Sequence, residues 1–347
     1  MKIYFKTNKI LHSIPRKFYA DWIKPLFPDL RHDIYGIKKK DLTLSLNPKN
    51  ADILILPLTW NYYFEYGKTD EAIEIIKFYE ILNKPIITWV SGDYKHKVMD
   101  GNFIILQHSL YKSKRKNNEY AYPAIIRDPF DYLNFYGVNI VSSFKKTRIS
   151  FCGAANWTLL DKCESLLKDF FFRIKNKAFR PYLDLRFPVS GMSLRGKLLK
   201  SFNQNKNFDT HIIIRKRRDN VLSNKEKYKF EYWNNILLAP FTICVRGNGN
   251  FSVRFYETLA LGRIPILIDT DCVLPFDNEI NWHKHCIIIR ETEPKRIADS
   301  VILSINAMDD NELINMQISN RKLWIDKLSF GGFYYSFTKK ILKKDIR

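Results

Sequence analysis

The stretch that decides the fold runs Phe241-Thr-Ile-Cys-Val-Arg246-Gly-Asn-Gly-Asn-Phe-Ser252-Val-Arg254-Phe-Tyr-Glu257-Thr-Leu-Ala-Leu-Gly262-Arg-Ile-Pro265-Ile-Leu-Ile-Asp269. Its pattern predicts a strand, a glycine loop, a helix, a tight turn and a second strand. Gly247 and Gly249 allow a sharp turn and let a ligand approach the backbone. Ser252 is a good N-cap for the helix, whose free N–H groups and positive dipole end form an anion site. The segment therefore predicts an α/β fold with an anion-binding loop.

Two charged residues follow the loop at a spacing that puts them on one face of the helix. Arg254 and Glu257 are three residues apart, so a cation lies beside the anion site and a carboxylate one turn further on. A nucleoside diphosphate requires this order, with arginine for the phosphates and a carboxylate for the ribose hydroxyls. Taken alone, the glycine loop is explained better as an ordinary surface loop followed by an Arg–Glu helix pair than as a nucleotide site. The register of Arg246 and Ser252 with that pair favours the nucleotide site.

Short apolar runs alternate with amphipathic stretches along the rest of the chain, which is typical of βαβ units and a mainly parallel sheet. The expected strands cover residues 51–57, 85–90, 103–106, 148–152, 210–214, 241–245, 265–268 and 286–289. The expected helices cover residues 69–82, 159–175, 194–203, 225–238, 252–261, 294–305 and 309–326. A chain of 347 residues with this pattern predicts two Rossmann-like domains. We expect them at residues 1–145 and 146–330, with a C-terminal helical tail over 331–347.

Residues 241–282 resemble the exostosin-like glycosyltransferases. The similarity is carried by Arg246-Gly, Ser252-x-Arg254-Phe-x-Glu257, Gly262-x-Ile-Pro265, Leu274-Pro-Phe276 and Ile280-Asn-Trp282. Three upstream segments occur in the family's order, namely Ala51–Pro57, Ser150–Ala154 and Arg195–Leu199. The resemblance implies a GT-B fold, in which two Rossmann-like domains face a central cleft. It also implies an inverting glycosyl transfer that requires neither a metal nor a cofactor.

The same resemblance implies roles for individual residues and partners. The donor would be a nucleotide sugar, which we expect to be UDP-linked, held mainly by the C-terminal domain. Arg254 would contact the donor phosphates, Glu257 the ribose, and Arg246 the phosphates or the transferred sugar, with Gly247, Gly249 and Ser252 completing the donor-binding loop. The acceptor would be a glycan, free or lipid-linked, bound by the N-terminal domain. The chain shows no secretory signal, membrane anchor or second catalytic domain, which favours a bacterial or viral enzyme that builds surface polysaccharide from the cytoplasmic side.

An inverting transfer needs a base for the proton of the acceptor hydroxyl, separate from the groups that neutralise the leaving diphosphate. Asp93 follows the expected strand 85–90, where open α/β sheets carry functional groups, and Gly92 allows a tight loop there. Asp93 is the expected base. His108 and Asp128 are rival candidates.

Two other motifs suggest chemistry that we do not expect. Asp269-Thr-Asp271 has the Asp-x-Asp pattern of a divalent-metal site, but it follows a strand that lies after the donor helix, which favours a strand-end turn. Gly191 to Leu198 nearly matches a phosphate-binding P-loop. Leu198 occupies the position where Ser or Thr must bind magnesium, so an NTPase is not expected.

The net charge is 57 − 36 = +21, which attracts anionic partners. A basic nucleic-acid-binding protein without catalytic activity is the alternative function, but no binding module is recognisable and we expect no nucleic-acid partner. The charge leaves open whether the protein is dispersed in the cytoplasm or held peripherally on the inner, anionic face of a membrane by clusters such as 112–116 and 339–344.

The five cysteines lie in largely apolar segments and form no Cys-x-x-Cys pair. We therefore expect buried free thiols in a reducing compartment.

Overall fold

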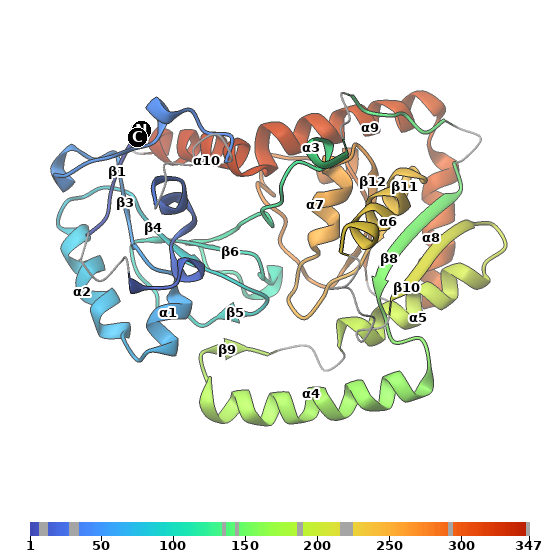
Figure 1. Cartoon of the computed structure of the whole chain (residues 1–347), viewed down its shortest axis with the longest axis horizontal. Coiled ribbons are helices and arrows are strands. Elements are labelled where there is room, and N and C mark those ends of the chain that lie inside the picture. Colours follow the sequence, from blue (N-terminus) through green and yellow to red (C-terminus); the bar gives the residue numbers. More distant parts are fainter. Residues whose placement is uncertain are drawn as a thin grey trace.

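The computed structural model describes residues 1–6, 13–27, 35–133, 137–142, 146–185, 190–215, 225–290 and 294–344. These residues form two α/β domains that lie side by side, with the N-terminal domain on the left of Figure 1 and the C-terminal domain on the right.

The N-terminal domain is built on a parallel sheet with the strand order β2-β1-β3-β4-β6-β7. Its strands are β1 (Lys2–Tyr4), β2 (Thr43–Leu44), β3 (Ile53–Ile55), β4 (Ile86–Val90), β6 (Ile104–Gln107) and β7 (Glu119–Ala121). Its helices are α1 (Trp60–Glu65) and α2 (Thr69–Glu80), whereas α3 (Pro129–Leu133), which lies in the connection between the domains, packs against the C-terminal domain through Phe130. The predicted strands and helix of this half are present, whereas β1, β2 and β7 have only two or three residues and leave no periodic pattern in the sequence.

The C-terminal domain has a second parallel sheet with the order β10-β8-β11-β12-β13. Its strands are β8 (Arg148–Ala154), β10 (Asp209–Arg215), β11 (Phe241–Cys244), β12 (Ile264–Asp269) and β13 (Ile287–Arg290). Its helices are α4 (Leu159–Phe179), α5 (Gly191–Gln204), α6 (Lys225–Leu237), α7 (Val253–Ala260), α8 (Pro294–Ala307) and α9 (Asp310–Leu323). Helices α5 and α8 contact each other, while α7 contacts α9, β11 and β12. Chain order reverses on either side of β8, so a ligand crevice is expected at the carboxyl ends of β8 and β11.

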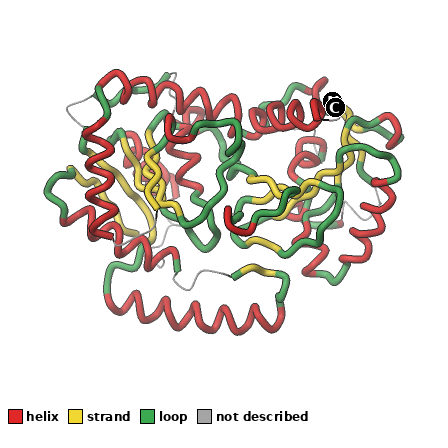
Figure 2. Tube along the Cα trace, turned by 180° about the vertical axis from the view of Figure 1, so that it is seen from behind, coloured by secondary structure: helices red, strands yellow, loops and turns green. Residues whose placement is uncertain are grey.

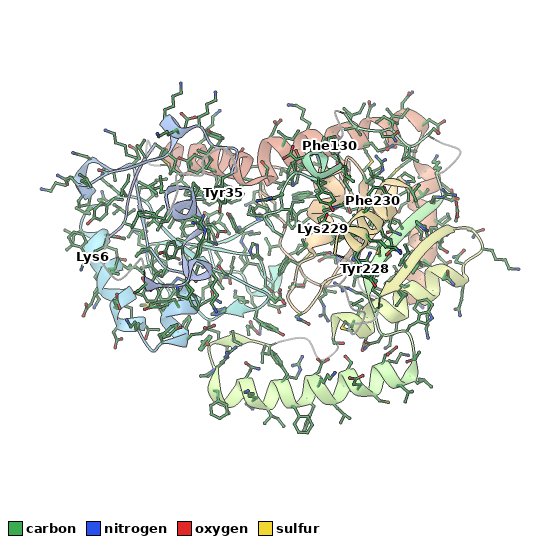
Figure 3. The ribbon with its side chains drawn as sticks, viewed as in Figure 1. Lys6, Tyr35, Phe130, Tyr228, Lys229 and Phe230 are labelled. Atoms are coloured by element: carbon green, nitrogen blue, oxygen red, sulfur yellow. The ribbon has the colours of Figure 1, made fainter. Side chains whose placement is uncertain are left out.

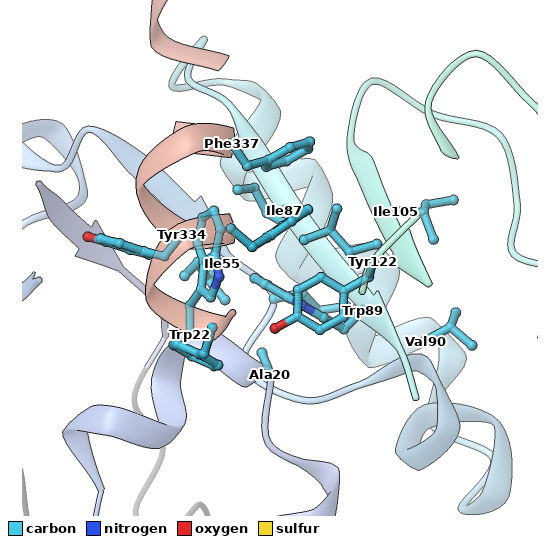
Figure 4. Close-up of a cluster of buried hydrophobic side chains, with 14 of the residues drawn as sticks. Ala20, Trp22, Ile55, Ile87, Trp89, Val90, Ile105, Tyr122, Tyr334 and Phe337 are labelled. Atoms are coloured by element: carbon cyan, nitrogen blue, oxygen red, sulfur yellow. The ribbon is translucent and has the colours of Figure 1, made fainter. Parts of the chain in front are cut away.

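The N-terminal core is rich in aromatic side chains, as Figure 4 shows. Trp22 packs edge-on against Trp89 of β4, with ring centroids 5.5 Å apart. It also packs against Tyr334, at 5.1 Å, and Phe337, at 6.3 Å, which both belong to α10 (Phe330–Lys344). The last helix of the chain therefore returns to the first domain and completes its core, and a π-helical turn over Trp324–Leu328 joins it to α9.

A small antiparallel pair links the two domains below their sheets. Strand β5 (Lys95–His96) of the first domain pairs with β9 (Leu183–Asp184), which follows α4 in the second. Phe64 stacks on Tyr182 beside this pair, with centroids 4.5 Å apart and planes 8° from parallel. Helix α4 thus lies along the lower edge of the molecule in both Figure 1 and Figure 2.

The fold class expected from the sequence is confirmed. Each domain is a Rossmann-like unit with a parallel sheet, and the carboxyl ends of β4, β8 and β11 contribute residues to one crevice between the domains. This is the GT-B arrangement. The chain passes from the first sheet to the second between Ala121 and Arg148.

Candidate active site

A cavity of about 390 Å³ lies between the domains. Its lining comprises Asp93, Ala154, Met192, Arg195, Tyr232, Gly247, Asn248, Gly249, Phe251, Ser252, Val253, Arg254 and Glu257. The structure therefore brings the predicted base and nearly all the predicted donor-binding residues to one place. Arg246 instead lines two smaller neighbouring pockets, one of them shared with Asn248.

The glycine loop is held in place by a buried asparagine. The Asn250 backbone N–H donates to Ser109 Oγ at 2.8 Å, and its side-chain amide donates to the Leu110 carbonyl at 2.8 Å. Thr270 Oγ1 donates to Asn250 Oδ1 at 2.7 Å. Asn250 has no exposed surface, and these hydrogen bonds to residues of both domains anchor the loop between them.

Helix α7 begins at Val253 directly after this loop, with Ser252 at the N-cap position. The predicted capping role is wrong in one respect, because the Ser252 side chain makes no cap hydrogen bond. Ser252 lines the cavity instead. The first N–H groups of α7 therefore lack a side-chain cap from Ser252, and anion binding can use them.

Arg254 is packed against the end of β8. Its Nη2 donates to the Cys152 carbonyl at 2.5 Å, and its guanidinium lies 4.1 Å from the centroid of the Phe151 ring. A Cβ on Gly153 would come within 2.6 Å of the same Nη2, so a side chain there would displace the guanidinium from this position. Arg254 is 8% exposed, and its Nε is buried without a hydrogen-bond partner among the described residues. Arg254 also lines the cavity, so a ligand there would meet its positive charge.

Glu257 lies one turn further along α7, as the sequence predicts, and accepts a hydrogen bond from the Tyr232 hydroxyl of α6. Burial raises the pKa of Glu257, while the Tyr232 hydrogen bond and the positive charge of Arg254 act in the opposite direction. A carboxylate desolvated in this way gains from hydroxyl donors supplied by a ligand.

Arg195 lines the cavity, but the sequence does not predict it as a site residue. In the sequence it is only the first residue of the segment Arg195–Leu199, which resembles the family. Its Nη1 donates to the Ala154 carbonyl at 3.3 Å and its Nη2 to the Val245 carbonyl at 3.2 Å. Desolvation, together with the positive charges of Arg254 and Arg246, lowers the pKa of Arg195 to about 10. The positive charges of Arg254 and Arg246 thus act on Arg195 unfavourably, and an anionic ligand in the cavity would relieve this repulsion.

The three candidate bases lie in different surroundings. Asp93 is exposed on the loop after β4, where Gly92 adopts a positive φ of 87°, and Asn248 Nδ2 donates to Asp93 Oδ2 at 3.3 Å. His108 stacks on Phe251 and contacts the Tyr122 carbonyl through Nδ1 at 2.9 Å, and burial lowers its pKa. Asp128 pairs with Arg321 at 2.6 Å. Of these three, Asp93 lines the cavity.

The Asp-x-Asp motif is used at the domain interface. Asp269 accepts from Lys112 Nζ at 2.8 Å and from the Cys272 N–H at 2.9 Å. Asp271 has a positive φ of 68° and accepts from the Ser113 hydroxyl at 2.6 Å. These contacts join the loop after β6 to the end of β12. Among the described residues, no group of His, Cys, Asp and Glu has the arrangement of a metal site.

A larger cleft of about 1410 Å³ borders the cavity, since Tyr232 and Glu257 line both. Its walls carry cations from both domains and several aromatic rings. Tyr228 and Lys229 of α6 lie on this side of the C-terminal domain, with Phe130 of α3 above them in Figure 3. The space beyond Glu257 is therefore open and lined by rings.

The comparisons with known proteins agree with the sequence motifs. Residues 168–304 match the Exostosin GT47 domain. A probable glucuronosyltransferase 47 A of Physcomitrium patens is 31% identical over 318 residues, which is 87% of this chain and 66% of that protein. The Exostosin-1 homolog of Caenorhabditis elegans is 36% identical over 78 residues, or 22% of this chain and 20% of that protein.

Exostosin-1 of Bos taurus is 26% identical over 145 residues, and the match covers 17% of its length. The alignments thus span about a fifth of the length of the exostosins. A solved glycosyltransferase of Rickettsia africae covers 99% of this chain and 98% of its own, at 12% identity and a TM-score of 0.39. By its domain match and its relatives, the chain belongs to the exostosin-like glycosyltransferase family.

Proposed function

We propose that this protein is an inverting glycosyltransferase that moves a hexosyl or pentosyl group from a nucleotide sugar to a hydroxyl of a polysaccharide or oligosaccharide. The observation that carries the proposal is the convergence of Arg195, Arg254 and the start of α7 on one cavity, opposite Asp93. A diphosphate is the ligand that best matches this cluster, because guanidinium groups and helix N–H groups bind phosphate oxygens.

The order of groups along the cavity supports a nucleotide. The diphosphate would lie at the start of α7, between the arginines, and the ribose would place its hydroxyls against Glu257. The nucleobase would then extend into the larger cleft, away from Asp93 and towards the ring of Tyr228. We infer that the base is uracil, as in UDP-linked donors, from the family resemblance alone.

In the proposed reaction, Asp93 acts on the acceptor and the arginines act on the donor diphosphate. Asp93 would take the proton of the acceptor hydroxyl while its oxygen attacks the anomeric carbon on the face opposite the diphosphate. The bond between that carbon and the diphosphate oxygen breaks, and the diphosphate leaves with the electron pair. Arg195, Arg246 and Arg254 would stabilise the charge that develops there, so no metal ion is required.

A thermal-shift screen tests the donor site. UDP, other nucleoside diphosphates and UDP-sugars are added to the full chain, and a ligand at roughly 100 times its Kd should raise stability by about 2.7 kcal/mol. Transfer is then measured with the stabilising sugar nucleotides and mixed glycan acceptors, and Asp93→Asn should retain binding but lose transfer. Salt-dependent binding to nucleic acid, with no response to any nucleotide, would instead support the basic nucleic-acid-binding alternative.

A further inference from the structure

Helix α4 presents its apolar side to the outside. Its outward residues form one stripe at spacings of three and four, and each is more than half exposed: Leu159, Leu160, Leu166, Leu167, Phe170, Phe171 and Ile174, with exposed fractions from 54% to 83%. Figure 3 shows the side chains of α4 projecting from the lower edge of the molecule, away from both domains. A surface helix ordinarily turns such a stripe towards the core.

The opposite side of α4, which faces the body, is largely polar. Asn176 is 5% exposed, Ser165 Oγ lies 3.1 Å from Ser190 Oγ, and Arg173 Nη1 donates to the Leu185 carbonyl at 2.8 Å. Phe172 is the aromatic contact on this side, stacked on Tyr94 of the first domain with centroids 5.4 Å apart. The orientation of α4 is therefore fixed by contacts on its inner side, and the apolar stripe is left uncovered.

Cys163 belongs to the exposed stripe. The expectation that all five cysteines are buried is wrong for this one, because it is exposed while the other four thiols are buried. A cysteine among leucines and phenylalanines adds little polarity to this surface. It also supplies a probe at the centre of the stripe.

Basic residues flank the stripe on both sides. Lys168 and Lys175 lie along one edge, and Lys162 along the other. Of the acidic residues of α4, Asp161 serves in the capping box and Asp169 lines an inner pocket, which leaves Glu164 beside Lys168. Two copies of α4 packed face to face would bring these like charges together.

We propose that α4 lies in the interfacial layer of an anionic membrane, with its leucines and phenylalanines among the acyl chains and its lysines at the headgroups. An apolar stripe with basic edges is the pattern of an interfacial helix, and the chain's charge of +21 adds long-range attraction. Within the described parts of the chain, no helix is long and apolar enough to cross a bilayer. The helix therefore rests on the surface.

The basic cluster at 112–116 is a weaker membrane contact than its sequence suggests. Lys112 pairs with Asp269 at 2.8 Å, Arg115 with Asp277 at 2.7 Å and Lys116 with Asp100 at 2.8 Å. These charges are largely neutralised within the protein, whereas the stripe of α4 has no covering partner among the described residues.

The position of α4 has a consequence for the acceptor, which rests on the proposed function. Tyr94, which stacks on Phe172, directly follows Asp93, and Arg173 shares a small pocket with Arg246 and Asn248. Docking α4 on a membrane would bring the mouth of the cleft close to the headgroups. A lipid-linked glycan is the acceptor that this geometry favours.

Vesicle flotation tests the docking of α4. Wild-type protein should float with vesicles of equal phosphatidylglycerol and phosphatidylcholine, and not with pure phosphatidylcholine. The triple variant Leu167→Gln, Phe170→Gln, Phe171→Gln should lose at least about tenfold of this binding, because each change removes apolar area from the inserted face. The matched control Leu46→Gln, Ile81→Gln, Leu303→Gln, at side chains that are 93%, 81% and 70% exposed elsewhere, should float like wild type.

Labelling at Cys163 provides a second measurement. An environment-sensitive maleimide dye there should shift to shorter wavelengths on adding anionic vesicles. Equal flotation of the α4 and control variants, or no flotation of the wild type, overturns the proposal. So does protection of Cys163 without vesicles that rises with protein concentration, because a second copy would then cover the stripe. The thermal shift that UDP produces should be the same in the α4 variant and the wild type. This measurement distinguishes a loss of membrane binding from a failure of the donor site.

Discussion

Gly249 lies directly against the backbone carbonyl of Asp93, so close that a Cβ on Gly249 would come within 1.9 Å of that oxygen. The two residues belong to different domains, and the contact joins the predicted base to the predicted donor loop. A side chain of any size at position 249 must push the two apart. The spacing between base and donor therefore depends on this glycine.

Gly249→Ala should separate the Asp93 loop from the donor loop and lower kcat/KM by about a hundredfold, since a displacement of about 1 Å can have that effect on a transfer reaction. Steady-state transfer kinetics measure the loss of kcat/KM, and a thermal melt shows whether the variant remains folded. Gly137→Ala, where a Cβ would meet nothing within 4 Å, is the control and should retain wild-type activity. Wild-type kinetics in Gly249→Ala would show that the contact does not set the catalytic geometry.

Arg254→Ala should weaken nucleotide binding by about 1.5–3 kcal/mol, the value of a hydrogen bond to a charged group. Arg254→Lys should recover part of this, because the charge remains but the planar donor pair is lost. Isothermal titration with UDP gives the affinities. Lys197→Ala, at an exposed position of α5, controls for the loss of one positive charge, and a UDP affinity in Arg254→Ala equal to that of this control would contradict the phosphate role.

The sequence predicted the part of the site that is local in the chain and not the part that packing assembles. The loop from Arg246 to Ser252 and the spacing of Arg254 and Glu257 are short-range features, since glycine, N-cap and helix-face preferences act over a few residues. Tyr232 reaches Glu257 from 25 residues away, and Arg195 reaches the Val245 carbonyl from 50. Nothing in their own segments identifies those partners.

The same limit applies to the fold. The βαβ periodicity predicted the long strands and helices, but α10 has an amphipathic pattern that fits many partners, and the core of the first domain that it completes lies roughly 300 residues earlier in the chain. For α4 the pattern predicted an ordinary amphipathic helix. The direction of its apolar side became clear only from the packing of Asn176 and Phe172.

Transfer should continue unchanged in excess EDTA, because three arginines and the start of α7 supply the positive charge that a metal would otherwise provide. Asp269 is paired with Lys112, so its carboxylate already has a cation. Initial rates with and without EDTA give the comparison. A rate lost in EDTA and restored by manganese would instead assign the Asp269 and Asp271 carboxylates to a metal.

Glu257→Gln should stabilise the unliganded protein at neutral pH while weakening its affinity for UDP. Burial raises the pKa of Glu257 above its ordinary 4.5, so the folded state binds this proton more tightly than the unfolded chain does. The ionised carboxylate therefore lowers the free energy of unfolding, and this cost appears as pH rises from 4.5 through the raised pKa and vanishes below 4.5. Neutral glutamine keeps the hydrogen bond from Tyr232 without the charge.

Thermal melts of Glu257→Gln and wild type at several pH values should show the largest gain at neutral pH and convergence near pH 4.5. The affinity for UDP should fall by about tenfold or more at neutral pH, since a charge-assisted hydrogen bond to the ribose is lost. Glu74→Gln, an exposed glutamate of α2, is the matched control and should change neither quantity. A variant that is less stable than wild type at neutral pH, with unchanged UDP affinity, would mean that Glu257 serves the fold and not the donor, because a carboxylate kept for ligand binding is expected to cost stability when the ligand is absent.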